Sequence, residues 1–289
     1  MTRIIVLGGS ALFWGVMMLA LVRREVLPYF EYQAPPSYKS FLRGVREPEL
    51  TVAEIFAATQ PVGTLETLAM PLGDGTWRIR TQLKMKARLP KAANNAGDQF
   101  DVGIKSESHV DALFRLTRTR SDIQLAFAQV SLRAERRQEM LVATFEFKVG
   151  GQRIAGGTQN IEFPPDGMIG DLFQPFPGGG PLHVGKKWKI PTISPDLTGF
   201  RVTSLYAAVT EHEPLVWNGE KVDTLRVEIR TEPTEEKRPK YVVLCREDGL
   251  ALSQQITFEN LLYEIVLKSR KTITRPEAYR WNAMYDGPP

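Results

Sequence analysis

Cysteine and histidine are scarce in this chain of 289 residues, which contains one cysteine and three histidines. The single cysteine, Cys245, excludes an intramolecular disulfide framework and a cysteine-built zinc site. Three histidines leave little room for a histidine metal cluster, so no cofactor is expected. Charge of one sign is also lacking, because 37 basic residues face 33 acidic ones. This modest excess argues against a nucleic-acid-binding protein.

Catalytic motifs are absent as well. Residues 180–186 match the start of a phosphate-binding Walker A loop, but Lys187 stands where that loop needs Ser or Thr. His109 and His212 have no marked serine nucleophile, since no G-x-S-x-G motif occurs, and both are expected to be surface histidines. Cys245 lies in an apolar strand-like run, which is typical of a buried small side chain. We therefore expect a protein that is not an enzyme.

The strongest signal is an uncharged, apolar run of 19 residues, 4–22, bounded by Arg3 and by Arg23 and Arg24. A helix of this length reaches roughly the thickness of a bilayer core. The two arginines disfavour signal peptidase cleavage, so an uncleaved anchor over residues 1–24 is preferred to a cleaved signal peptide. The anchor residues are Ile4, Leu12, Phe13, Trp14, Leu19 and Val22.

The charges that flank this run do not decide its orientation, because Arg23 and Arg24 are followed by Glu25. A short N-terminal tail before a large domain is the usual signal-anchor arrangement, in which the domain is exported. We expect a single-pass protein of the cell inner membrane with its main domain on the periplasmic side. The sequence pI of about 9.1 fits contact with anionic lipid headgroups.

Three regions follow the anchor. Residues 25–60 combine prolines with aromatic residues between Tyr29 and Tyr38, which predicts a juxtamembrane stalk. Within this region Thr51 and Glu54 match a capping box and predict a short helix over about 51–59. Residues 61–274 are expected to form an antiparallel β domain, and residues 275–289, with Trp281, a C-terminal arm.

Alternation of apolar and polar residues predicts about ten strands. Gly150-Gly151 and Asn218-Gly219 predict tight hairpin turns, and residues 113–128 are read as two strands broken near 120–122. The predicted fold class is mainly β, with an antiparallel curved sheet, half-barrel or sandwich after the membrane helix.

Two sets of side chains are candidates for binding. If the sheet curls without a second layer, its apolar face forms a cavity for a lipid-like ligand, whereas in a sandwich the same residues are core. That face includes Trp77, Ile79, Leu83, Met85, Phe145 and Phe147. Basic residues are expected either to contact headgroups or a partner, or to form a solvated sheet face. They are Arg23, Arg24, Arg115, Arg118, Arg120, Arg133, Arg136 and Arg137.

Residues 140–268 run through a strand, a glycine turn, a strand, the segment PLHVGKKW, a long hairpin and the turn REDGL before another strand. This order resembles lipoprotein-carrier-like (LolA/LolB-like) domains and related uncharacterised exported bacterial β domains. The resemblance implies a curved antiparallel sheet, an envelope location and an apolar ligand. The chain differs from the carriers in having a membrane helix in place of a cleaved signal or a lipobox cysteine.

The sequence therefore predicts a membrane-anchored envelope protein whose exported β domain binds a protein partner or an apolar, lipid-like ligand without catalysis. The alternative is an accessory structural subunit of a larger membrane complex, with residues 29–38 and Trp281 as contacts. A hydrolase assembled from scattered residues is the third hypothesis.

Overall fold

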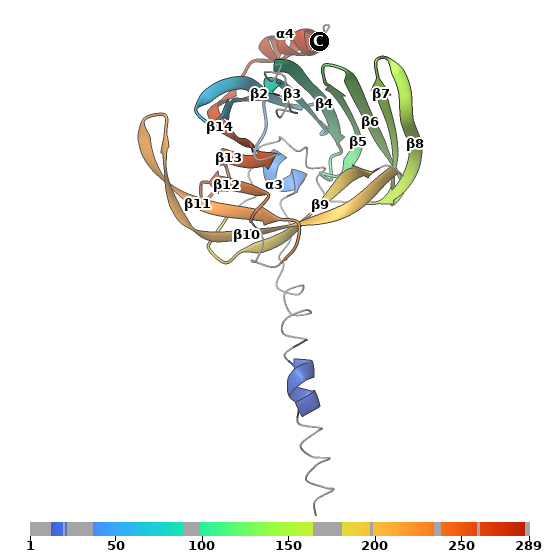
Figure 1. The fold of residues 1–289 in the computed structure, drawn as a ribbon. Helices are drawn as coiled ribbons and strands as arrows, with labels where there is room; N and C mark the ends of the chain where they lie inside the picture. Colours follow the sequence, from blue (N-terminus) through green and yellow to red (C-terminus); the bar gives the residue numbers. More distant parts are fainter. Residues whose placement is uncertain are drawn as a thin grey trace, which may run out of the picture.

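The β domain is one 14-stranded antiparallel sheet. The computed structural model describes residues 13–19, 21, 37–88, 99–163, 181–196, 199–233, 238–258 and 261–286. Figure 1 shows the sheet curling round so that its two edges, β8 (Gln152–Glu162) and β9 (Lys187–Asp196), come close together. No ladder joins these edges within the described ranges, although β8 contacts β10. The mainly-β, curved antiparallel sheet is confirmed, and because there is one sheet, the fold is not a sandwich.

The strands form two meanders that meet at β1 and β14, in the order β8-β7-β6-β5-β4-β3-β2-β1-β14-β13-β12-β11-β10-β9. The first meander contains β1 (Glu49–Ala57), β2 (Gln60–Pro71), β3 (Trp77–Arg88), β4 (Gln99–Val110), β5 (Leu116–Gln124), β6 (Ala128–Arg137), β7 (Met140–Val149) and β8. The second contains β9, β10 (Gly199–Trp217), β11 (Glu220–Arg230), β12 (Tyr241–Cys245), β13 (Ala251–Phe258) and β14 (Leu261–Thr272).

The predicted helix over 51–59 is wrong, because this segment is the central strand β1. β1 pairs with β2 on one side and with β14 on the other, and its side chains Ala53 and Ile55 are buried. Glu54 does not cap a helix but forms an ion pair of 2.9 Å with Lys268 of β14. Backbone pairing on both sides outweighs a local capping signal, since tertiary contacts routinely override propensity.

The strand count exceeds the predicted ten partly because β1 and β2 were missed. β2 contains Pro61, Gly63 and Pro71, which are poor strand formers. The predicted break near residues 120–122 is also wrong, since β5 runs unbroken through them and the chain turns at 125–127.

The hairpin turns at Gly150-Gly151 and Asn218-Gly219 are confirmed. All four residues have positive φ, with Asn218 at 50° and Gly219 at 85°. A two-residue turn with positive φ at both positions matches the right-handed twist of the strands that it joins.

Two buried apolar clusters fill the inner face of the curved sheet. One joins β1–β4 to β9–β14, and the other packs the helix α3 (Tyr38–Leu42) against the first meander. Tyr38 and Leu42 are both buried, so this part of the predicted stalk contributes to the core of the domain. A row of hydroxyl groups lies between the clusters, with Thr67 and Thr81 hydrogen-bonded at 3.2 Å.

The predicted C-terminal arm contains the helix α4 (Arg275–Asp286), which packs on the outer face of the sheet (Figure 1). Thr274 caps it, because its backbone N–H and hydroxyl both donate to the carboxylate of Glu277 at 2.8 Å. Trp281 and Tyr285 are buried in a third cluster with Leu68 and Met70 of β2. Trp281 is therefore held by its own domain, and the partner contact expected of the C-terminal arm stays a prediction.

The junction of the two meanders provides a stability test. Ile55 is completely buried in β1, so Ile55→Ala should lower the free energy of unfolding by about 3 kcal/mol through lost burial and a residual cavity. Val216→Ala is the control, because Val216 is 74% exposed and the expected change is below about 0.5 kcal/mol. Urea denaturation of both variants measures the difference, and equal losses would contradict this account of the junction.

Candidate binding site on the outer face of β3 to β6

The strand alternation separates the predicted basic residues into two groups. Arg118 and Arg120 of β5 and Arg137 of β6 line a hollow on the outer face, together with Arg133. Arg136 instead donates to the carbonyl oxygens of Leu116, at 2.9 Å, and Phe163.

Two further sequence-predicted sets lie elsewhere. Arg115 pairs with Asp111 at 2.8 Å beside the β4–β5 turn. Arg23 and Arg24 lie outside the described residues. The sequence cluster therefore supplies four arginines to one surface, Arg118, Arg120, Arg133 and Arg137.

The outer hollow has a volume of about 480 Å³. Register pairs place Arg80, Glu107, Arg120 and Arg133 in one cross-strand row across β3, β4, β5 and β6. The neighbouring row contains His109, Arg118 and Glu135. The residues that line the hollow are Glu107, His109, Arg118, Thr119, Arg120, Arg133, Ala134, Glu135, Arg137, Val142 and Thr144.

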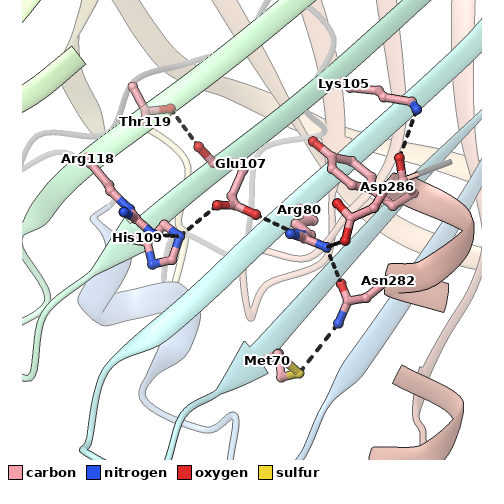
Figure 2. A network of polar contacts seen from close by, with 10 residues as sticks. Met70, Arg80, Lys105, Glu107, His109, Arg118, Thr119, Asn282 and Asp286 are labelled. Carbon is pink, nitrogen blue, oxygen red and sulfur yellow. Dashed lines mark hydrogen bonds and ion pairs between the residues drawn. The ribbon is translucent and has the colours of Figure 1, made fainter. Parts of the chain in front are cut away.

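Glu107 is the centre of a polar network beside this hollow (Figure 2). One carboxylate oxygen is 2.8 Å from Nε2 of His109, and the other accepts a hydrogen bond of 2.5 Å from Nε of Arg80. Arg118 approaches the same imidazole nitrogen at 3.0 Å. The side chain of His109 is 14% exposed and lines this hollow, so His109 is a half-buried residue of the outer surface. His212, by contrast, is exposed and pairs with Asp223.

Arg80 links the network to α4. Its Nη1 donates to Asn282 at 3.0 Å and to Asp286 at 3.2 Å, and its guanidinium lies 4.8 Å from the centre of the Tyr285 ring. Lys105 adds a hydrogen bond of 2.8 Å to the backbone oxygen of Tyr285. A planar guanidinium suits this role because it can donate to several acceptors and stack on an aromatic ring at once. The network thus fixes α4 at one border of the outer hollow.

The hydrogen bond with His109 is the largest cause that lowers the pKa of Glu107, from 4.5 to about 2. Burial opposes this shift, and Arg80 reinforces it by a hydrogen bond and by its charge. The carboxylate is therefore ionised throughout the physiological range, and its charge is balanced by its neighbours.

A second hollow, of about 730 Å³, lies where β3, β4 and β5 end near the β5–β6 turn. Its apolar wall comes from side chains of the interior cluster and from half-buried residues packed against that cluster. They are Val62, Leu83, Met85, Val102, Ile104, Ile123 and Leu125. The rest of the lining is mainly polar and contains the basic residues Lys84, Lys86, Lys105 and Arg120 beside the acidic residues Asp101 and Asp122. Arg120 lines both hollows, which shows that they adjoin.

The residues of the predicted apolar ligand face lie in two different places in the structure. Leu83 and Met85 line the strand-end hollow. Trp77, Ile79 and Phe145 instead pack in the cluster that contains α3, and Phe147 is half-buried. The helix α3 therefore covers half of the apolar face for which the sequence allowed either a ligand cavity or a closed core.

Two other sequence candidates, Cys245 and the Walker-like segment, occupy ordinary structural positions. Burial raises the pKa of the Cys245 thiol to about 12, as expected for a buried small side chain. Residues 187–196 are strand β9, so no helix follows the Walker-like segment. In the described part of the chain no group of His, Cys, Asp and Glu could hold a metal ion. The absence of enzymatic activity stays a prediction.

The predicted anchor falls mostly outside the described residues. Residues 13–19 are helical, and their large apolar side chains are exposed, Phe13 at 64% and Trp14 at 67%. Among the residues that the structure describes, none of the helices has both the length and the apolar character needed to cross a membrane.

Comparison with known proteins identifies no family. No protein-family model matches the chain, and no curated protein does. Among solved structures, the chain is similar to a beta-barrel-like protein of a domain of unknown function (DUF1849) from Brucella abortus. The TM-score is 0.47 at 9% identity, over 78% of this chain and 98% of that one. The resemblance to lipoprotein-carrier-like domains stays a prediction.

The Glu107 network predicts a pH dependence of stability. Because folding lowers the pKa of Glu107, its contribution to stability is fully present above pH 4.5 and is lost as the pH falls toward 2. Glu107→Gln should therefore be less stable than the wild type at neutral pH and lose stability less steeply over this range. Urea denaturation at a series of pH values measures both effects.

Glu139→Gln is the matched control, since Glu139 is an exposed glutamate in the β6–β7 turn. This variant should keep the acid-dependent loss of the wild type. If the free energies of unfolding of Glu107→Gln and of the wild type fall in parallel between pH 4.5 and 2, the ionised Glu107 side chain does not stabilise the fold.

Proposed function

We propose that this protein is a membrane-tethered, non-catalytic binding protein whose curved β domain holds an apolar, lipid-like ligand. The strand-end hollow is the observation that carries this proposal. Its volume of about 730 Å³ falls in the range of small-molecule sites, and its lining combines apolar residues with four basic and two acidic ones. The apolar wall accommodates acyl chains, and the basic side chains suit a polar head.

The tether supports the same function. The exposed apolar helix over residues 13–19 lies within the uncharged run 4–22, and apolar side chains around a whole helix need a lipid environment or another apolar partner. We propose that the β domain lies on the extracytoplasmic side, as in signal-anchored proteins whose large domain follows the apolar run. A domain held at the membrane surface would meet lipid-like ligands at high local concentration.

Filling the hollow should block the ligand. Gly103 lines it, and a Cβ at this position would meet only Gln124 Cβ at 3.9 Å, which is an ordinary contact. Gly103→Leu should therefore fold normally but weaken binding of the apolar fluorescent probe N-phenylnaphthylamine about tenfold, which corresponds to about 1.4 kcal/mol. Fluorescence titration of the full chain in a non-ionic detergent measures this change.

Gly73→Leu is the matched control, because Gly73 lies in the exposed turn before β3 and has open space around it. Mass spectrometry of lipids released from the purified chain gives an independent readout. Equal probe affinity in wild type, Gly103→Leu and Gly73→Leu, with no lipid released, rules out a ligand in this hollow.

Charges introduced into the tether should release the protein from membranes. Each arginine at the centre of an inserted helix costs about 2.5–3.5 kcal/mol, so the double variant Phe13→Arg, Met17→Arg should move to the soluble fraction. The double variant Leu113→Arg, Phe127→Arg adds the same charge at exposed apolar positions of the β domain and should stay with the membrane. Carbonate extraction separates the two cases, and a wild-type chain that is already soluble contradicts the tether.

A further inference from the structure

The outer hollow concentrates guanidinium groups beyond what its own carboxylates need. Arg120 and Arg133 are direct cross-strand partners on the same face of β5 and β6. Like charges in this position lie about 5 Å apart at Cβ and destabilise a sheet. Arg118 lies two residues before Arg120 on the same face, about 7 Å away along the strand. Three cationic side chains therefore border one hollow of about 480 Å³.

The nearby carboxylates are already engaged. Glu107 is bound by Arg80 and His109, and Asp122 accepts a hydrogen bond of 2.6 Å from Arg120. The lining carries four arginines, Arg118, Arg120, Arg133 and Arg137, against the two glutamates Glu107 and Glu135. Arg120 pairs with Asp122 and Arg137 lies 3.7 Å from Glu135, so the arginines of the lining that form no ion pair with a described carboxylate are Arg118 and Arg133.

The hydrogen bonds of Nε2 of His109 with Glu107 and with Arg118 cannot both form at the same time. Nε2 of His109 lies 2.8 Å from a carboxylate oxygen of Glu107 and 3.0 Å from Nη2 of Arg118. This nitrogen can donate a hydrogen bond to Glu107 or accept one from Arg118, but it cannot do both. When it donates to Glu107, the guanidinium N–H of Arg118 faces another donor. An anion in the hollow would give this N–H an acceptor.

We propose that the outer hollow binds a phosphomonoester through Arg118, Arg120 and Arg133. A phosphomonoester carries a charge of about −1.5 to −2 at neutral pH and three terminal oxygens. Three guanidinium groups on two strands can meet these oxygens together, whereas a planar carboxylate is matched by a single bidentate arginine. Because Arg120 also lines the strand-end hollow, this site deepens the proposed function by naming the head group of the ligand.

Titration calorimetry of the full chain with glycerol phosphate, in a non-ionic detergent, tests the anion site. We expect saturable binding that Arg118→Gln, Arg120→Gln and Arg133→Gln each weaken about tenfold. Arg115→Gln should leave the affinity unchanged, because Arg115 pairs with Asp111 and does not line the hollow. Sodium chloride at matched ionic strength should give no saturable heat.

Thermal unfolding separates binding from a structural role. Arg133→Gln removes a like-charge pair, so without phosphate its Tm should equal or exceed that of the wild type. Glycerol phosphate should raise the Tm of the wild type and have little effect on the variant. A lowered Tm in Arg133→Gln would assign this arginine to the fold and overturn the site.

A short-chain phosphatidic acid distinguishes a lipid head group from a soluble phosphate, with a chain-matched phosphatidylcholine as the control for detergent partitioning. If the ligand is a lipid, phosphatidic acid should bind at least about tenfold tighter than glycerol phosphate. Gly103→Leu should then lower the affinity for phosphatidic acid to that for glycerol phosphate and leave the latter unchanged. Equal affinities that do not respond to Gly103→Leu would assign the site to a soluble phosphorylated molecule. Failure of glycerol phosphate to bind overturns the anion site, while the naphthylamine titration judges the apolar hollow separately.

Discussion

The antiparallel pairing of β1 with β14 joins residues near position 50 to residues near position 270, and the whole sheet depends on it. Each meander needs only pairing between strands that follow one another in sequence, and this ladder fuses the two into one surface. It also places α4, which follows β14, where it can reach β2 and β3. The helix closes one side of the outer face, and Arg80 holds it there through Asn282 and Asp286.

The two faces of the first meander have different chemistry because side chains alternate along each strand. In the described residues the inner face is filled by α3 and by two apolar clusters, and a hollow lies where β3, β4 and β5 end. The outer face carries rows of opposite and like charges, in which Arg120 and Arg133 lie directly opposite each other. A ligand with an apolar body and a phosphorylated head would use both surfaces, with Arg120 at their border.

Two capping-box patterns of the same spacing show why local sequence predicts a helix correctly at one place and wrongly at another. Thr51 with Glu54 and Thr274 with Glu277 both have the spacing of a capping box. The second begins α4, where the last strand has ended and Pro276 suits the first turn of a helix. The first lies in β1, where Ala53 and Ile55 face the core and two strands supply backbone partners. Only the long-range partners distinguish these two segments.

Alternation and turn residues alone determined that the chain is mainly β, that glycine turns join its hairpins, and that Cys245 is a buried small side chain. These properties are local, since they follow from φ values and from a period of two. Tertiary structure alone decided that β1 is a strand, that α3 covers Ile79 on the inner face, and that Arg133 joins Arg118 and Arg120 while Arg136 turns away. These outcomes depend on strand register and helix docking, which bring together residues far apart in sequence.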